Sequence, residues 1–553
     1  MRERTMRELT LHFFRRLFEN DVVQSGDDMV TTVVRALAVV AAPGLMFAFW
    51  LQNQYPQRTH WGRIEDEYFF VMFSFVAMAG VAIFEWEMLF PDHLDFLVLT
   101  PLPLRRWQMP ATKAAALVMF LGLFLGAANL FGLLMLPALT KTNIGRQFAA
   151  QATATLSAGI FGVLAVMLLG RVLVSVVPAR LFRGISLIFR MLTVTTLGLL
   201  VIHYARFGDS MPGLLADGGQ RMRWFPTFWF LGLYQAIQYG GSAPEFAHSM
   251  AHRADTALGV VLLGVVVVYP VAWDRMRRLA VEEQVNRGAG SGHWTRAAIH
   301  AIVRRPEERA VFHFIGKTMT RNSRYHLYMA VYFGAGLALA ISCITHVRTV
   351  GGVAEPGLSE FGLHAVMPLL VFWVVAGLKM AFAFPLQLHA KWIFRTTGAS
   401  LSRCVAAASK WALACGLAVV ILVVIFLACL HLSGRELLVQ TVFGVCLCAV
   451  LVDAFFFAQT SVPFSQPRHP GRTSLPLVLT LYLGILTPFI FGMILLELKV
   501  EKNLFLLIGV VGLVPVVHQL LRKLRDRAVL IEEERENADG EFQLLGLCGD
   551  LTA

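Results

Sequence analysis

The chain has 553 residues, of which 57% are hydrophobic and 15% are charged, and its mean hydropathy is +0.63. A soluble protein of this length cannot bury so much apolar surface, so the composition predicts an all-α polytopic membrane protein. The net charge of +12 comes from Lys and Arg gathered between apolar runs. That distribution is typical of orientation in a membrane and does not indicate nucleic-acid binding.

The first predicted element is an amphipathic helix at residues 7–20, with Phe13 and Leu17 on its apolar face. We expect it to lie in the membrane interface ahead of the first span. The aromatic-rich stretch 224–241 predicts short helices at the outer interface. Twelve apolar runs are long enough to span the bilayer, at residues 33–52, 68–89, 113–139, 150–177, 185–204, 254–273, 327–346, 364–384, 411–432, 437–459, 474–496 and 503–521.

Lys and Arg are concentrated in alternate loops, which orients the chain in the membrane. With the N-terminus inside, the cytoplasmic segments hold pairs such as Arg15 with Arg16 and Arg105 with Arg106, whereas the outer loop 347–363 holds Arg348 alone. We therefore predict a multi-pass protein of a bacterial-type inner membrane with both termini in the cytoplasm.

The two halves of the chain carry an internal repeat. FPDHLDFLVLTPLPLRRWQMPATK at 90–113 returns as FPLQLHAKWIFRTTGASLSRCVAAASK at 384–410, and HFFRR at 12–16 is echoed by HFIGK at 313–317. Because equivalent points are an even number of spans apart, the halves have the same orientation, which is a parallel repeat. The predicted organisation is a first half at 1–285, a cytoplasmic linker at 286–310, a second half at 311–530 and a charged cytoplasmic tail at 531–553.

The order of these features along the chain resembles that of the membrane subunit of an export-type (type 2) ABC transporter. The resemblance covers most of the chain. The helix at 7–20 resembles the N-terminal elbow of that class, and the connector after the second span resembles its coupling segment. The segment PLPLRRWQMPATK at 101–113 is similar to the basic, Pro-containing sequence that many such permeases have before the third span. The stretch 224–241 resembles the short outer helices of that class. Such permeases usually have six spans and pair, so twelve spans imply a fused pair. The second half has only the turn 497–503 in place of the outer helices.

The resemblance implies transport driven by ATP, and the chain has no phosphate-binding loop of its own. The stretch Gly316-Lys317-Thr318 has the end of such a motif, but Val311 stands where the motif requires Gly. We therefore expect no enzyme activity and no bound cofactor or metal in this chain, with ATP on separate ABC ATPase subunits. The other expected partners are the lipid bilayer and a substrate of unknown identity, and nucleic acid is not expected.

The two connectors are the predicted contacts with the ATPase. A polar segment held between two spans can transmit rigid-body motion from a partner that closes on ATP. The alternative is that these side chains are ordinary interfacial anchors. The predicted coupling residues are Asp92, His93, Asp95, Arg105 and Arg106 in the first connector and Gln387, His389, Lys391, Arg395 and Arg403 in the second.

Charges inside the spans are a second group of candidates, because each costs about 2.5–3.5 kcal/mol at mid-membrane. They are Glu85, Glu87, Lys379 and Asp453. Glu85 and Lys379 each precede a Phe-Pro pair by five residues, so they occupy equivalent repeat positions and are candidates to pair across the central axis. The alternative is that both snorkel to the cytoplasmic interface. Asp453 is expected to face the bundle interior, for a helix-helix hydrogen bond or a substrate pathway.

An ion-gradient-driven secondary transporter is the alternative function, because parallel six-plus-six repeats also occur in the major facilitator superfamily. Against it, the connector after the second span lacks the Gly-xxx-Asp-Arg text of that superfamily, and deeply buried carboxylates are scarce in the predicted spans.

Overall fold

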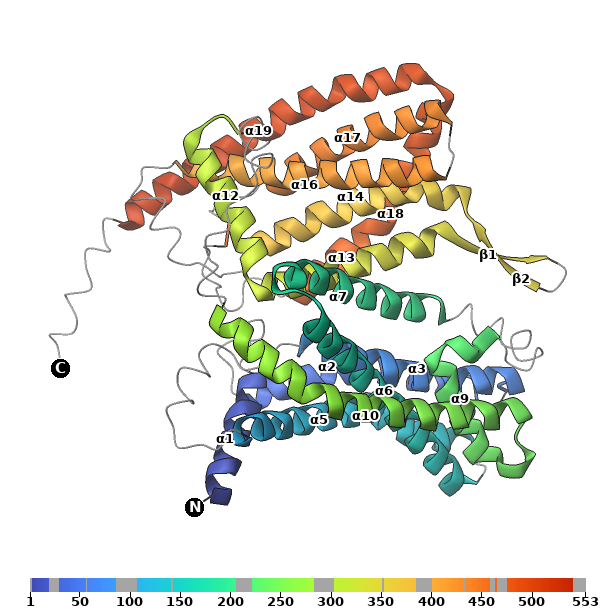
Figure 1. Cartoon of the computed structure of the whole chain (residues 1–553). Coiled ribbons are helices and arrows are strands. Elements are labelled where there is room, and N and C mark those ends of the chain that lie inside the picture. Colours follow the sequence, from blue (N-terminus) through green and yellow to red (C-terminus); the bar gives the residue numbers. More distant parts are fainter. Residues whose placement is uncertain are drawn as a thin grey trace, which may run out of the picture. The chain divides into compact units, whose positions relative to one another are not determined.

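In a computed structural model of the chain, the residues described are helical almost throughout (Figure 1). Apolar runs of this length satisfy their backbone hydrogen bonds internally only as helices. The structure describes residues 2–18, 29–55, 57–85, 107–140, 143–204, 221–282, 303–350, 353–383, 400–430, 433–457, 463–464 and 475–540.

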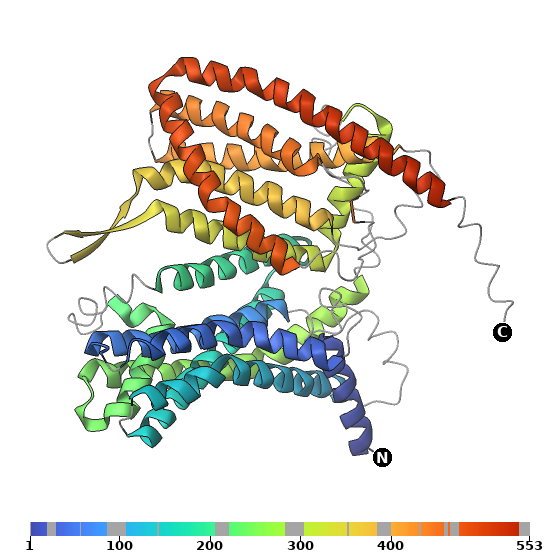
Figure 2. The same ribbon diagram turned by 180° about the vertical axis from the view of Figure 1, so that it is seen from behind.

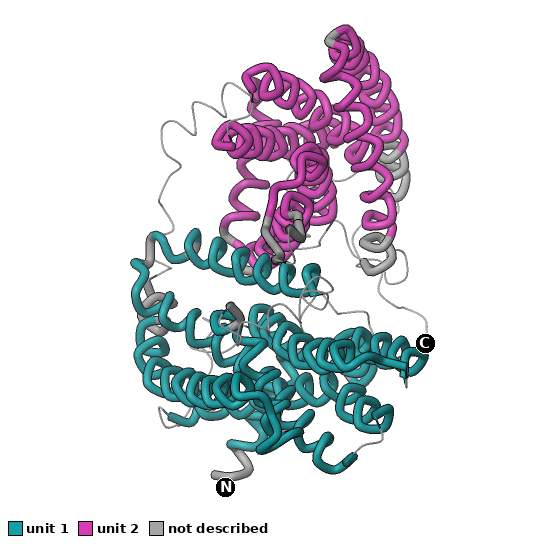
Figure 3. Tube along the Cα trace, turned by 90° about the vertical axis from the view of Figure 1, so that its right-hand side faces the viewer, with its two compact units in different colours: residues 1–289, 349–355 teal, residues 290–348, 356–553 magenta. Residues whose placement is uncertain are grey.

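The chain divides into two compact units, residues 1–289 with 349–355 and residues 290–348 with 356–553 (Figure 3). Among the described residues, 12 helices are long and apolar enough to cross a membrane. They match the predicted runs one for one, and six belong to each unit. The prediction of an all-α polytopic membrane protein is therefore confirmed.

In the first unit, helices α3 and α6 pack together, and α9 lies against α3, α6 and α10. Helix α9 has Pro at its first position and buries Phe228, Phe230 and Leu231, so the aromatic stretch 224–241 is helical as predicted. The elements of this unit are α1 (Arg2–Phe18), α2 (Met29–Gln52), α3 (His60–Phe84), α5 (Gln108–Thr140), α6 (Ile144–Val176), α7 (Ala179–Ile202), η1 (Arg221–Trp224), α9 (Pro226–Tyr239), η2 (Gly240–Ser242) and α10 (Glu245–Glu282).

In the second unit, α14 is the most buried span and packs against α13, α16, α17 and α18 (Figures 1 and 2). Strands β1 and β2 pair with each other and come between α13 and α14 in the sequence, and their residues 349–355 are grouped with the first unit. The elements are α12 (Pro306–Arg321), α13 (Ser323–Ile344), β1 (Thr345–Val350), β2 (Val353–Leu358), α14 (Glu360–Phe382), α16 (Leu401–Cys429), α17 (Gly434–Phe456), α18 (Leu475–Lys502) and α19 (Leu504–Gly540).

The two units share a pattern of internal contacts. Helix α1, the predicted interfacial helix, packs against α5, which follows the first connector. Its counterpart in the repeat, α12, packs against α16, which follows the second connector, and we call α1 and α12 the predicted interfacial helices. The second span of each unit packs against the third and fourth, α3 against α5 and α6, and α14 against α16 and α17. These are equivalent pairs in the predicted repeat.

Several helix ends differ from the predicted ones. Helix α3 begins at His60 and not at residue 68, because Thr59 caps it by accepting a hydrogen bond from the Gly62 backbone N–H at 3.1 Å. Helix α12 begins at Pro306, inside the predicted linker, since Pro suits the first helical position. Helix α19 continues to Gly540, inside the predicted tail.

Candidate functional site

Most of the predicted coupling residues lie outside the described residues, in 86–106 and 384–399. Their contact with an ATPase stays a prediction. Arg403 is described and lies in the first turn of α16. The residues outside the description are Asp92, His93, Asp95, Arg105, Arg106, Gln387, His389, Lys391 and Arg395.

Two ion pairs join α16 to the interfacial helix α12. Arg403 Nη1 lies 2.5 Å from Glu307 Oε2, and Lys410 Nζ lies 2.5 Å from Glu308 Oε2. The two cations are two turns apart on one face of α16, and the two carboxylates lie in the first turn of α12, where a helix favours negative charge. The Arg403 and Glu307 side chains are well exposed. That pair therefore sets the orientation of α12 on α16 more than it adds stability.

The first unit has an equivalent contact between α1 and α5. Phe13 and Leu17 of α1 are buried, as the amphipathic pattern predicts. Lys113 of α5 is buried as well, and its Nζ lies 5.1 Å from the centroid of the Phe13 ring, a cation-π contact. Lys113 and Lys410 are the last residues of the two repeated stretches, so each copy of the repeat ends on a Lys that contacts the interfacial helix of its own unit.

The predicted intramembrane charges have different surroundings. Asp453 is 8% exposed, and its Oδ2 lies 2.6 Å from Nδ1 of His518, so it joins α17 to α19. Glu85 follows the last residue of α3 and is buried, and its Oε2 has no hydrogen-bond partner among the described residues. Lys379 of α14 has its Nζ 5.5 Å from the Phe456 ring centroid. Glu85 and Lys379 belong to different units, so their pairing stays a prediction. Glu87 lies outside the described residues.

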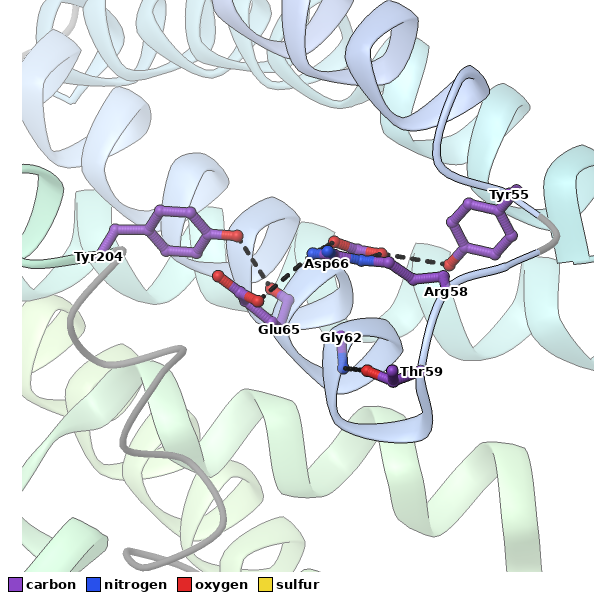
Figure 4. Close-up of polar contacts among 7 residues, drawn as sticks. All are labelled: Tyr55, Arg58, Thr59, Gly62, Glu65, Asp66 and Tyr204. Carbon is purple, nitrogen blue, oxygen red and sulfur yellow. Dashed lines mark hydrogen bonds and ion pairs between the residues drawn. The ribbon is translucent and has the colours of Figure 1, made fainter.

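A buried polar cluster between α2 and α3 was not predicted (Figure 4). The Arg58 guanidinium donates two hydrogen bonds to Asp66, from Nη2 to Oδ1 at 2.8 Å and from Nε to Oδ2 at 3.1 Å. Its Nη2 also lies 3.3 Å from Glu65 Oε2. Tyr55 Oη donates to Asp66 Oδ2 at 3.3 Å, and Tyr204 Oη donates to the Glu65 backbone carbonyl at 3.3 Å. The Asp66 side chain is fully buried, so its charge depends on these donors.

The charges of this cluster are set by the planar guanidinium of Arg58, which faces the Asp66 carboxylate. A bidentate Arg–carboxylate pair is among the strong hydrogen-bonded pairs in proteins. The side-chain hydrogen bond with Asp66 is the largest effect on Arg58 and raises the pKa of its guanidinium. Burial is the largest effect on Tyr55 and Tyr204 and raises the pKa of both phenols. All three side chains therefore hold their protons and act as donors at neutral pH.

A second series of buried polar groups lies deeper in the first unit, on α3, α5 and α6. Ser74 Oγ donates to the Thr155 backbone carbonyl at 2.7 Å, and Asn129 Nδ2 donates to Ser74 Oγ at 3.0 Å. Glu67 and Gln151 are also buried. Glu67 Oε2 and both amide atoms of Gln151 have no hydrogen-bond partner among the described residues. Polar groups of this kind inside a membrane protein are candidates for a transport pathway.

Sequence reasoning missed the first cluster because it placed residues 53–67 in an outer loop. Ser74, Asn129 and Thr155 of the second series lie in three different predicted spans, and the sequence does not show how those spans pack. The available signal was Thr59, which is a good N-cap residue, followed by the apolar residues Ile64 and Tyr68 one turn apart. An earlier helix start puts Asp66 and Glu67 inside the span. The expectation that buried carboxylates are scarce was therefore wrong for α3.

No protein-family model, curated protein or solved structure matches the chain. The architecture itself, 12 long apolar helices divided between two units, is that of a multi-pass membrane protein and favours a membrane transporter.

Proposed function

We propose that the chain is the membrane-spanning permease of an ABC transporter, an exporter in which separate ATPase subunits drive substrate movement. One observation carries the proposal. In each unit, the helix that follows the connector contacts the interfacial helix, through Lys113 in the first unit and through Arg403 and Lys410 in the second. Each connector is therefore followed by a helix, α5 or α16, whose first turns contact the predicted interfacial helix of the same unit.

This arrangement suits mechanical coupling. A motor that moves a connector also moves the start of α5 or α16, because the repeated stretches run into those helices. The interfacial helix then moves with them, since packed helices shift as rigid bodies. Exposed ion pairs such as Arg403 with Glu307 exchange partners at little cost, so they permit such a shift.

The proposal is tested by affinity purification of the intact complex from native membranes. We expect an ABC ATPase to purify with the chain. Changing Asp92 and Asp95 together to Asn should weaken that association about tenfold, equivalent to about 1.4 kcal/mol of binding free energy. The same purification of Arg348→Gln, in the predicted outer loop, is the control and should match the wild type. If no ATPase purifies with the wild-type chain, the proposal is wrong.

A charge exchange tests the contact between α12 and α16. Glu307→Arg and Arg403→Glu should each lower the ATPase activity of the complex several-fold, because each places like charges together. The double variant should regain most of the activity, since it restores opposite charges. Lys317→Glu, an equal charge change at an exposed site of α12, is the matched control. Losses that simply add in the double variant would contradict a direct functional contact.

Buried carboxylates favour a second candidate, a secondary transporter driven by an ion gradient. Asp66 and Asp453 are buried but have cationic or imidazole partners, whereas Glu67 keeps one carboxylate oxygen without a partner among the described residues. A carboxylate of that kind is suited to carry a proton. Proton uptake by the isolated chain in liposomes with an imposed pH gradient, without ATP, would support this candidate against the first.

A further inference from the structure

A third polar cluster lies in the second unit, where α14, α17 and α18 meet. It consists of His364 on α14, Gln440 on α17, and Glu497 and Glu501 on α18. Glu497 and Glu501 are one turn apart, so both carboxylates lie on the same face of α18. Helix α14 packs against both α17 and α18, which brings side chains distant in the sequence to one place.

The donor atoms of this cluster converge. Nδ1 of His364 lies 2.6 Å from Oε1 of Glu497 and 3.8 Å from Oε1 of Glu501. Nε2 of Gln440 donates to Oε1 of Glu497 and lies 3.5 Å from Nδ1 of His364. One donor atom from each of His364, Glu497 and Glu501 falls within 4.8 Å of the others.

The cluster is buried and its hydrogen bonding is incomplete. Glu497 is 0% exposed and Gln440 is 1% exposed. Even so, Oε2 of Glu497, Oε1 of Gln440 and Oε1 of Glu501 have no hydrogen-bond partner among the described residues. Arg435 is nearby, but its Nη2 donates to the backbone carbonyl of Glu501 at 3.1 Å and not to the carboxylate. Buried acceptors without donors are costly, and a cation bound between the two carboxylates would offset part of that cost.

We propose that His364, Glu497 and Glu501 bind a divalent transition-metal ion of the zinc class. One imidazole nitrogen and two carboxylate oxygens are ligands that Zn²⁺ accepts, whereas Mg²⁺ and Ca²⁺ prefer oxygen ligands alone. Tetrahedral ligands about 2.0–2.1 Å from zinc lie about 3.3 Å apart. The distances of 2.6 and 3.8 Å from His364 to the two carboxylates bracket that separation, so small side-chain shifts would create the site.

Gln440 is the candidate for a further ligand in this site. Its amide contacts Glu497, and its own Oε1 has no partner among the described residues. Rotation of the amide would bring Oε1 toward the ion as a further oxygen ligand. The His364 and Glu501 side chains are 19% and 21% exposed, which gives an ion a path from the end of the helices. A bound ion would hold the ends of α14 and α18 together.

The experiment uses the full chain, purified in detergent with a tag that lacks His, treated with a chelator and then dialysed. We expect calorimetric titration with Zn²⁺ to show one site, the thermal midpoint to rise with Zn²⁺, and Mg²⁺ to have no such effect. Glu497→Gln and Glu501→Gln keep side-chain size and should weaken Zn²⁺ binding at least about tenfold. Asp453→Asn is the matched control, because Asp453 and His518 form a pair at 2.6 Å that has no third His, Cys, Asp or Glu ligand among the described residues. It should bind Zn²⁺ as the wild type does.

Three results would overturn the proposal. If chelated wild-type protein neither binds Zn²⁺ nor gains thermal stability from it, His364 and Glu497 form an ion pair only. If Co²⁺ added in place of Zn²⁺ gives a thiolate charge-transfer band, the metal lies at cysteines such as Cys415 and Cys448 and not at this cluster. Retained binding in both Gln variants would have the same meaning. A Co²⁺ spectrum typical of nitrogen and oxygen ligands would support the site.

Discussion

Replacing Arg58 with Met is expected to lower the free energy of unfolding of the first unit by about 3–5 kcal/mol, the usual cost of breaking a buried ion pair from one side. Among the described residues, the variant leaves the fully buried Asp66 carboxylate with the Tyr55 hydroxyl as its one side-chain donor. Met has a similar length to the Arg stem, so the loss comes from the missing charge and hydrogen bonds more than from packing. Titration of the purified protein with sodium dodecyl sulfate, followed by tryptophan fluorescence, measures the loss.

Two further variants separate the ion pair from a general effect of the substitution. Arg63→Met changes an exposed Arg in the first turn of α3, five residues after Arg58, and should unfold as the wild type does. Arg58→Met combined with Asp66→Asn should recover much of the loss, because the neutral amide does not require a counter-charge. An Arg58→Met protein as stable as the Arg63→Met control would show that the cluster does not hold the start of α3.

Replacing Gly362 with Ala is expected to cost about 1–3 kcal/mol, the usual cost of overpacking a filled interior. A Cβ atom at Gly362 would lie 2.0 Å from the backbone oxygen of Cys343 and 2.7 Å from its carbonyl carbon. Backbone atoms cannot move away by a rotamer change. The end of α13 and the start of α14 must therefore separate, although Ser359 caps α14 and donates its N–H to the Ile344 carbonyl at 2.8 Å.

Gly484 is the matched control for this experiment. It lies in α18 of the same unit, and a Cβ atom there would meet nothing within 4 Å. Gly484→Ala should leave stability unchanged or raise it by up to about 1 kcal/mol, because Ala favours helix. The thermal midpoints of the two variants in detergent give the comparison. Equal midpoints for Gly362→Ala and Gly484→Ala would contradict the close approach of α13 and α14.

The membrane helices could be predicted from the sequence because the signal for each is local. A run of apolar residues long enough to cross the bilayer must be a helix, whatever it later packs against. The amphipathic helix with buried Phe13 and Leu17 was predictable for the same reason, since its pattern repeats with the helical period. Helix ends were less predictable, as α3 shows, because its polar first turns resemble a loop when their partners are unknown.

The buried polar clusters could not be predicted, because their members are distant in the sequence. Tyr204 contacts Glu65 across 139 residues, and His364 contacts Glu497 across 133. No spacing motif links such residues, so the sequence led us to expect no metal in this chain. The opposite holds for the connectors, which the sequence reveals better than the structure does. Their repeat was visible in the sequence, but most of their predicted coupling residues lie outside the described residues.

Helix α19 has a mechanical consequence that follows from its length alone. Its 37 residues extend about 55 Å at 1.5 Å per residue, whereas the hydrocarbon core is about 30 Å thick. About 25 Å of continuous helix must therefore project beyond the bilayer as a stiff rod. A tilt of about 10° within the membrane would move the tip of that rod by about 4 Å. A small tilt of the transmembrane part of α19 therefore becomes a displacement of several ångströms at the far end of the helix.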